Sequence, residues 1–353
     1  MISSIEIENF KCFQKLEIDK CRRINVVVGE NGCGKTALLE AIFVALASSP
    51  EVILRFRSQR GHEGNYSSQT KDIEEAVVRD LFYANDWSGV ISVKLNGTGP
   101  EARSVRVFRE ANATKSIPFE EDKDGSSDFN VPTRGVRFLW KSADTREYDS
   151  FLKVTPKGFE FEQTAEDVPD FFYVSSMHAT NSRENANRFS KLSRVGRSEQ
   201  FVKIFTDEFD WLEGLSIEVD AGNPLLYASV KGQKDKVALP NISAGLNRMI
   251  GVMLSIASRQ NSVVLVDEIE NGLYYSHQSE IWRGLLSLVS DHNGQIFLTT
   301  HSEEWLNALV DAAGEHYEDI ALWRVERDRN NFPVVRQFIG DQVILGIKAG
   351  EVR

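Results

Sequence analysis

A glycine-rich run near the start of the chain has the residue types needed to hold phosphate groups. Gly29–Thr36 reads Gly-Glu-Asn-Gly-Cys-Gly-Lys-Thr and matches the pattern G-x-x-x-x-G-K-[ST]. The glycines let backbone N–H groups converge on phosphate oxygens, and the following helix points its positive end at them. A glycine turn with an incidental lysine is the alternative. The run predicts a phosphate-binding loop (P-loop) whose binding residues are Asn31, Gly32, Cys33, Gly34, Lys35 and Thr36, with Thr36 also holding Mg²⁺.

Two adjacent carboxylates lie far downstream, at the end of an apolar stretch. Asp267 and Glu268 follow Val263–Val266, four residues typical of a buried strand. A strand of the sheet that carries the P-loop would bring both acids beside it. Asp267 would then support the Mg²⁺ ion, and Glu268 would polarise the attacking water. Taken by itself, the pattern also fits a strand that ends in a solvated acidic turn, but the P-loop favours the functional interpretation.

A histidine, His301, follows the next apolar strand, Gln295–Thr299. A single histidine at a strand end is commonly exposed or structurally satisfied. Here the position falls at the carboxyl edge of the predicted sheet, where open α/β sheets bind their ligands. We therefore predict that His301 donates a hydrogen bond to the γ-phosphate.

A helix start rich in small residues precedes the acidic pair. Ser243, Gly245 and Arg248 belong to the run Ile-Ser-Ala-Gly-Leu-Asn-Arg, which leads into a strongly apolar helix. Ser243 is a favourable N-cap residue, and that role alone explains its presence. An exposed helix N-terminus is also an anion site, so phosphate binding is the alternative.

The elements that must position these residues alternate between strand and helix patterns. An apolar strand, 24–28, comes before the P-loop, and an apolar helix, 37–47, comes after it. The last third of the chain repeats the alternation: helix 244–258, strand 262–266, helix 276–290, strand 295–299 and helix 303–313. Strands that alternate with helices predict a mainly parallel sheet flanked by helices on both faces.

The remaining patterns are short. The β-like runs are 3–8, 16–19, 90–95, 104–108, 136–140 and 171–174, and one amphipathic helix pattern covers 197–214. We expect an α/β fold in one composite domain, 1–353. Residues 1–49 and 241–353 would form the nucleotide-binding core. Residues 50–240 would form an inserted antiparallel β lobe and a helical arm or lid.

Composition limits the class of protein further. The 353 residues are 41% hydrophobic and 26% charged, as in globular proteins. A formal net charge of -11 disfavours indiscriminate coating of nucleic acid, although it permits a local basic patch. Three cysteines without paired spacing indicate neither a disulfide framework nor a zinc site. We expect a protein of the reducing cytoplasm that has no signal peptide and no membrane span.

The order of the motifs resembles that of the ABC ATPase superfamily, in its non-transport branch of SMC, RecF and OLD-like (overcoming lysogenization defect) ATPases. The residues that carry the resemblance are the P-loop, the S-x-G-x-x-R helix start, the acidic strand end and Thr299-Thr300-His301-Ser302. The opening run Ile5–Phe13 resembles the N-terminal strand and turn of the branch. Asp267–Tyr274 resembles its Walker B motif and D-loop. The final residues, Gly350–Arg353, are similar to the close of stand-alone bacterial AAA-type members.

The resemblance implies roles for the motif residues. Lys35 and Thr36 would take the Walker A roles, with ATP as ligand, while Asp267 would bind the metal and Glu268 would act as catalytic base. Ser243, Gly245 and Arg248 would form a signature that completes the nucleotide site of a second subunit. Three positions depart from the usual pattern: Ala244 replaces a glycine-like residue, Tyr274 a frequent histidine, and Lys11 a frequent arginine. Lys11 is included as a candidate nucleotide contact.

The same resemblance implies an ATP-hydrolysing switch that dimerises around ATP in bacterial anti-phage defence or DNA maintenance. No long coiled coil separates the lobes, and the stretch after residue 340 is too short for the TOPRIM nuclease domain of full OLD nucleases. We therefore expect a separate nuclease or toxin partner. The alternatives are a soluble ATPase subunit of a membrane transporter, which would need an L-S-G-G-Q signature, and a non-hydrolysing nucleotide-bound scaffold.

A cluster of basic residues makes nucleic acid a candidate partner. Residues 183–203 carry two aromatic side chains, Phe189 and Phe201, among several cations. Such a combination can track a phosphate backbone. A solvated face of the lid is the alternative. The cations are Arg183, Arg188, Lys191, Arg194, Arg197 and Lys203.

Overall fold

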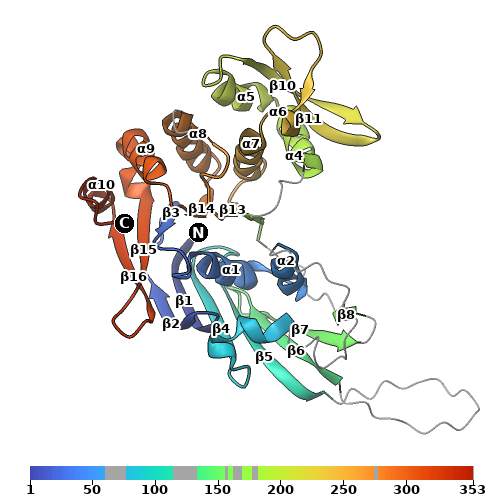
Figure 1. Cartoon of the computed structure of the whole chain (residues 1–353). Helices are drawn as coiled ribbons and strands as arrows, with labels where there is room; N and C mark the ends of the chain where they lie inside the picture. The colour runs from blue at the N-terminus through green and yellow to red at the C-terminus, as the bar shows by residue number, and fades with distance from the viewer. Residues whose placement is uncertain are drawn as a thin grey trace, which may run out of the picture.

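Three β-sheets organise the chain. The computed structural model describes residues 1–59, 77–113, 133–155, 158–161, 169–176, 182–273 and 277–352. Within these residues there are a six-stranded sheet, a seven-stranded sheet and a three-stranded sheet, and the six-stranded sheet lies between the other two (Figure 1). None of the helices described is long and apolar enough to cross a membrane.

The six-stranded sheet forms the core and has the order β16-β15-β3-β14-β13-β9. Five of its strands are parallel, and β16 pairs antiparallel with β15 at one edge. The mainly parallel sheet predicted from the sequence is therefore confirmed. The strands are β3 (Ile24–Val28), β9 (Phe171–Val174), β13 (Val263–Val266), β14 (Gln295–Thr299), β15 (Ile320–Arg327) and β16 (Pro333–Ile339).

Two hydrophobic clusters cover the two faces of this sheet, because successive side chains of a strand point to opposite sides. In β13, Val263 and Leu265 belong to one cluster, and Val264 and Val266 belong to the other. The first face packs on α1 (Lys35–Leu46), which is buried nearly all round because the seven-stranded sheet covers its other side. The second face packs on α7 (Ala244–Ala257), α8 (Gln278–Asp291), α9 (Glu303–Ala313) and α10 (Asp341–Lys348).

The seven-stranded sheet is antiparallel and has the order β2-β1-β4-β5-β6-β7-β8. It is the β lobe that the sequence predicted. The short helices around the two layers are α2 (Glu51–Gln59), η1 (Arg79–Leu81), η2 (Tyr83–Asn85) and η4 (Gly314–Asp319). The strands are β1 (Ile2–Phe10), β2 (Phe13–Ile18), β4 (Ile91–Gly97), β5 (Arg103–Ala113), β6 (Thr133–Lys141), β7 (Glu147–Thr155) and β8 (Gly158–Phe161).

The β lobe and the nucleotide-binding core each contain strands that the sequence analysis assigned to the other. Their boundaries along the sequence therefore differ from those expected. The first two strands, assigned to the core, belong to the β lobe, and β9, from within the predicted insertion, is a strand of the core sheet. The reason is pairing: β1 hydrogen-bonds to β4, and β9 lies parallel to β13 in full register. A division made along the sequence cannot separate two interleaved sheets.

The lid consists of helices and a three-stranded sheet, and it stands beyond α7 and α8 in Figure 1. The helix predicted over 197–214 is wrong in its second half, because the chain turns after residue 206 and enters a strand at Leu212. The buried side chains Phe205, Phe209 and Leu212 keep a helical spacing through the turn, which explains the error. The lid elements are α4 (Ser182–Arg194), α5 (Ser198–Thr206), β10 (Leu212–Asp220), β11 (Asn223–Val230), β12 (Val237–Ala238) and α6 (Leu239–Ile242).

Candidate nucleotide site

The P-loop joins the end of β3 to the start of α1, as the sequence predicted. Lys35 is buried, and its ammonium donates to the backbone carbonyls of Gly29 and Glu30, each at 2.8 Å. Burial lowers the pKa of Lys35. The first turn of α1 contains no acidic residue and has no side-chain cap. Its positive end is therefore left to an anion.

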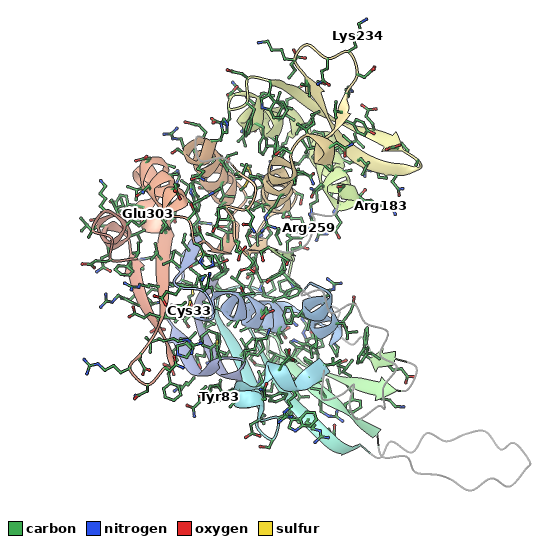
Figure 2. The ribbon with its side chains drawn as sticks, in the orientation of Figure 1. Cys33, Tyr83, Arg183, Lys234, Arg259 and Glu303 are labelled. Carbon is green, nitrogen blue, oxygen red and sulfur yellow. The ribbon has the colours of Figure 1, made fainter. Side chains whose placement is uncertain are left out.

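The P-loop glycines have conformations and surroundings that other residues would disturb. Gly32 and Gly34 have positive φ angles of 75° and 118°. A Cβ at Gly34 would lie 2.8 Å from the sulfur of Cys12, and one at Gly29 would lie 2.1 Å from the carbonyl oxygen of Val325. Asn31 and Gly32 are exposed at the tip of the loop, whereas Cys33, labelled in Figure 2, is buried.

Asp267 lies at the carboxyl end of β13 and faces three hydroxyl groups. The Thr36 hydroxyl is 3.1 and 3.2 Å from the two carboxylate oxygens, Thr299 donates at 2.8 Å, and Ser176 donates at 3.2 Å. Carboxylate and hydroxyl oxygens are the hard ligands that Mg²⁺ prefers. The donor set therefore fits the predicted magnesium site, in which other ligands would come from phosphate and water.

Glu268 has a left-handed backbone, with φ of 51°. Such a conformation is costly for a residue other than glycine and is often found at functional sites. The Glu268 N–H donates to the Thr299 hydroxyl at 2.7 Å, and the Asn271 amide donates to the carboxylate at 2.8 Å. These contacts fix both the backbone and the side chain of the predicted base beside Asp267.

His301 lies close to the P-loop, on the neighbouring strand end. Its backbone N–H donates to Glu270 at 2.7 Å, and its side chain is exposed. A hollow of about 240 Å³ is lined by His301 together with Gly29 and Glu30 of the P-loop. The structure therefore brings together the P-loop, Asp267, Glu268 and His301, although they are far apart in the sequence.

The start of α7 contacts the acidic strand end but not through Ser243. The Ser243 hydroxyl accepts from the Leu246 N–H at 3.1 Å, so it is an N-cap, as the simpler interpretation held. Gly245 packs against the turn after Glu268, since a Cβ there would lie 1.7 Å from the carbonyl oxygen of Gly272. None of the hydrogen bonds in the described part of the chain joins Ser243 to the P-loop.

Arg248 points into the protein rather than toward a second subunit. Its guanidinium donates to the backbone carbonyls of Ser175, Asp267 and Glu268. The side chain is buried, and burial lowers its pKa. Through these hydrogen bonds, Arg248 links α7 to the acidic strand end. A contact of Arg248 with a partner's nucleotide, predicted from the sequence, has no support in this arrangement.

Lys11 also has a partner within the chain. Its ammonium pairs with Glu40 of α1 and lies 5.2 Å from the ring centre of Phe56. Both charged groups of the pair are almost completely buried. Lys11 therefore ties the turn after β1 to the helix that follows the P-loop. Its predicted contact with the nucleotide remains a prediction.

Three polar residues of the site escaped the sequence analysis. Ser176 and Thr299 bind Asp267, and Arg327 donates to the carbonyl of Gly32 in the P-loop at 2.9 Å. Ser176 follows β9, which becomes a neighbour of the acidic strand only through long-range pairing. Thr299 stands in the run that carries His301, so its position at a strand end was the only available signal. Nothing in the sequence distinguishes Arg327 from other surface arginines.

The six basic residues predicted to contact phosphate differ in their exposure to solvent. Arg188 is partly buried over the Phe172 ring, 4.6 Å from its centre, and pairs with Glu184 at 3.0 Å. Arg197 lies 3.4 Å from a ring nitrogen of His292. Arg188 is therefore engaged in packing. The other five predicted phosphate contacts are exposed: Arg183, Lys191, Arg194, Arg197 and Lys203.

Known proteins show similarity to this chain over most of its length. The family described as "AAA domain, putative AbiEii toxin, Type IV TA system" matches residues 24–307. An "ATP/GTP phosphatase" of Helicobacter pylori (strain ATCC 700392 / 26695) is 23% identical over 341 residues, which cover 88% of this chain and 87% of that protein. The "DNA replication and repair protein RecF" of Bacillus cereus (strain B4264) is 47% identical over 49 residues, 14% of this chain and 13% of that protein.

A solved structure agrees with the fold. It is described as "Crystal structure of the SmcHead bound to the C-winged helix domain of ScpA" and covers 96% of this chain and 98% of its own, at 14% identity and a TM-score of 0.52. The P-loop and the acidic strand end define a P-loop ATPase. Its fold is like that of an SMC head, and part of its sequence is similar to RecF. The chain belongs to the AAA-domain family named above, whose model spans most of its length.

Proposed function

We propose that the chain hydrolyses ATP with Mg²⁺ and that ATP joins two copies of it into a transient dimer. The observation that carries the proposal is the convergence of Thr36, Asp267 and Glu268 at the carboxyl edge of the core sheet. Lys35 supplies the cation for the phosphates, and the bare start of α1 supplies backbone N–H groups. The Helicobacter relative is named an ATP/GTP phosphatase, which supports the same reaction.

Each residue of the site has a chemical task in this proposal. Thr36 and Asp267 would hold Mg²⁺, which neutralises developing charge on the phosphate oxygens. Ser176 and Thr299 orient the Asp267 carboxylate, because each donates to one of its oxygens. Glu268 takes the proton of the attacking water, and the Asn271 amide keeps its carboxylate in place. His301 donates to the γ-phosphate from the P-loop side of the site.

The dimer follows from what one copy leaves incomplete. The P-loop tip residues Asn31 and Gly32 are exposed, and the start of α7 is directed elsewhere in the same chain. The Ser243 and Gly245 terminus of a second copy would face the γ-phosphate and complete the site. Hydrolysis removes the charge that both copies hold, so the dimer would separate after each turnover.

The decisive experiment traps the dimer. Glu268→Gln keeps the size of the side chain and leaves ATP binding intact, while it slows the activation of water. This variant should accumulate as a dimer with ATP and remain monomeric with ADP, as measured by light scattering. Ser243→Arg in the Glu268→Gln background should block the dimer and keep ATP binding. A monomer of Glu268→Gln with saturating ATP would contradict the proposal.

We further propose that the switch acts on a separate effector, a nuclease or toxin, in bacterial defence or DNA maintenance. The family description names a toxin of a toxin–antitoxin system, and the SMC head structure contains a bound partner protein, which supports an effector partner here. Phage plating by cells that carry the gene with its neighbouring genes tests the setting. Protection that is lost in Lys35→Ala would support it, whereas protection without a functional P-loop would contradict it.

A further inference from the structure

The lid sheet has a free edge. Its order is β10-β11-β12, so among the residues that the structure describes β10 pairs with β11 alone. An unpaired edge presents a row of backbone N–H and C=O groups to which another chain can add. The other end of the sheet is different, because β12 has only two residues and leads directly into α6.

The turn between β10 and β11 determines which backbone groups face outward. Ala221 and Gly222 both have positive φ angles, 47° and 82°, which is the pattern of a two-residue type I′ hairpin turn. In such a hairpin the closing pair, Asp220 and Asn223, is hydrogen-bonded, and bonded and non-bonded pairs then alternate. Leu215, Ile217 and Val219 therefore point their N–H and C=O groups away from β11, toward the free edge.

A groove runs beside this edge. It has a volume of about 590 Å³ and lies between β10 on one side and the helices α4 and α5 on the other. Glu213–Ile217 form its strand wall, and five residues of a strand span about 17 Å. Phe189 and Val202 contribute apolar surface from the helices. A strand wall that faces a helix wall is the arrangement in which domains bind a peptide as an added strand.

The helix wall carries two cations and one anion. Arg194, Lys203 and Glu199 line the helix side, so its net charge is positive, and Glu213 lies on the strand side. In the part of the chain that the structure describes, neither Arg194 nor Lys203 has a carboxylate partner. Apolar surface continues beyond the groove, since Val219 at the end of β10 is 73% exposed. The helix side therefore matches a chain that brings apolar and acidic side chains to it.

We propose that this groove binds an extended segment of the effector protein, which adds to β10 as a fourth strand of the lid sheet. Side chains of the segment that face α4 and α5 are apolar and include an acidic residue opposite Lys203 and Arg194. Its other side chains are polar and face solvent beside Ser216 and Glu218. The proposal rests on the proposed function only for the identity of the occupant. The groove itself is defined without reference to ATP.

The test uses the full-length protein and a synthetic peptide. The peptide has eight residues, alternates valine with threonine, and carries glutamate at one valine position; its binding is measured by fluorescence anisotropy. Two further peptides carry N-methyl groups on the odd or on the even backbone nitrogens. Only one of these should bind at least about tenfold more weakly, because a strand uses alternate N–H groups on one edge. Equal binding by all three peptides would overturn strand addition.

Protein variants test the groove itself. Lys203→Glu should weaken the peptide at least about fivefold, and Lys234→Glu, on the exposed loop labelled in Figure 2 and outside the groove, should not. Thermal unfolding of both variants verifies that they are folded. Equal affinities would overturn the proposed location. A concentration-dependent self-association that the peptide abolishes would replace the effector with a second copy.

ATP turnover in the same preparations separates the two proposals. If Lys203→Glu weakens peptide binding and Lys234→Glu does not, while wild-type protein fails to hydrolyse ATP, the proposed function is wrong and the proposed peptide site is supported. If ATP turnover and ATP-dependent dimers are found but no peptide binds as an added strand, the groove proposal is wrong and the ATPase stands.

Discussion

The nucleotide site and the lid use charged and polar residues in opposite ways. At the site, Asp267 is bound by Thr36, Thr299 and Ser176, which come from three different parts of the chain. In the lid, some charges pair within the lid itself, as in Glu184 with Arg188 and Glu218 with Lys236. Long-range bonds fix geometry only when the whole sheet is formed. Pairs within the lid do not depend on the core sheet in this way.

The contrast extends to glycine. In the core, Gly245 and Gly272 are in direct contact, and no Cβ can be placed between them. In the lid, Gly214 and Gly232 have no atom within 4 Å of a Cβ position. Gly245 is therefore required by the close approach of two backbones, whereas Gly214 is not. Substitutions should harm function strongly in the first region and weakly in the second.

The largest effect is expected at Lys35. Lys35→Ala removes the buried cation of the P-loop, so the β- and γ-phosphates lose a charge-assisted contact that no neighbouring residue replaces. ATP affinity should fall at least about 100-fold, measured by calorimetry or by a fluorescent nucleotide. Lys234→Ala in the lid is the control and should bind as wild type. Unchanged affinity of Lys35→Ala would refute the P-loop assignment.

The next effect concerns the glycine contact. Gly245→Ala places a Cβ 1.7 Å from the carbonyl oxygen of Gly272, and a backbone cannot yield as a flexible side chain does. The α7 start must move away from the acidic strand end, which should lower the unfolding free energy by about 1 to 3 kcal/mol and reduce ATP turnover. Denaturant unfolding and turnover measure both. Gly214→Ala should change neither, and an equal response of the two variants would contradict the contrast between the regions.

The core of the fold was predictable because function imposes local patterns on it. The P-loop and the strand ends that carry Asp267 and His301 all have short apolar runs, and the predicted strands 24–28, 171–174 and 295–299 match the structure. The C-terminal strands β15 and β16 and helix α10 were not predicted. The alternation of apolar and polar residues in β16 is interrupted, so its signal was weak.

The remaining errors came from contacts between distant segments. Ser176 and Arg327 enter the site because β9 and β15 pair with strands far away in the sequence. Arg248 has the sequence position expected of a signature residue, yet its guanidinium lies on internal carbonyls. Tyr274, a predicted departure in the D-loop, lies outside the described residues. A sequence motif can single out a polar residue as a candidate site residue without determining which group its side chain binds.

A smaller effect is expected at Arg248. Arg248→Lys keeps the charge but cannot donate to three carbonyls in the geometry of a guanidinium. The contact between α7 and the backbone of Asp267 and Glu268 should therefore weaken. We expect kcat to fall about tenfold while KM and ATP affinity change little, because the P-loop is untouched. Steady-state turnover and nucleotide binding measure these. A change in affinity alone would point to direct contact with the nucleotide.

The smallest effect of a single substitution is expected on the lid surface. If DNA binds there, the five exposed cations of residues 183–203 would contact phosphates, whereas Arg188 is packed on Phe172. Five contacts give a log–log salt slope of about -4.5, so DNA affinity should fall about 500-fold between about 50 and about 200 mM salt. Lys191→Ala should reduce the slope by about 0.9. Arg188→Ala should leave the slope unchanged and lower the melting temperature, since it removes a packed cation. DNA-stimulated ATP turnover and filter binding measure the slope. If turnover is flat with duplex and single strands at every salt concentration, the lid cations are a solvated face, and the lid serves proteins alone.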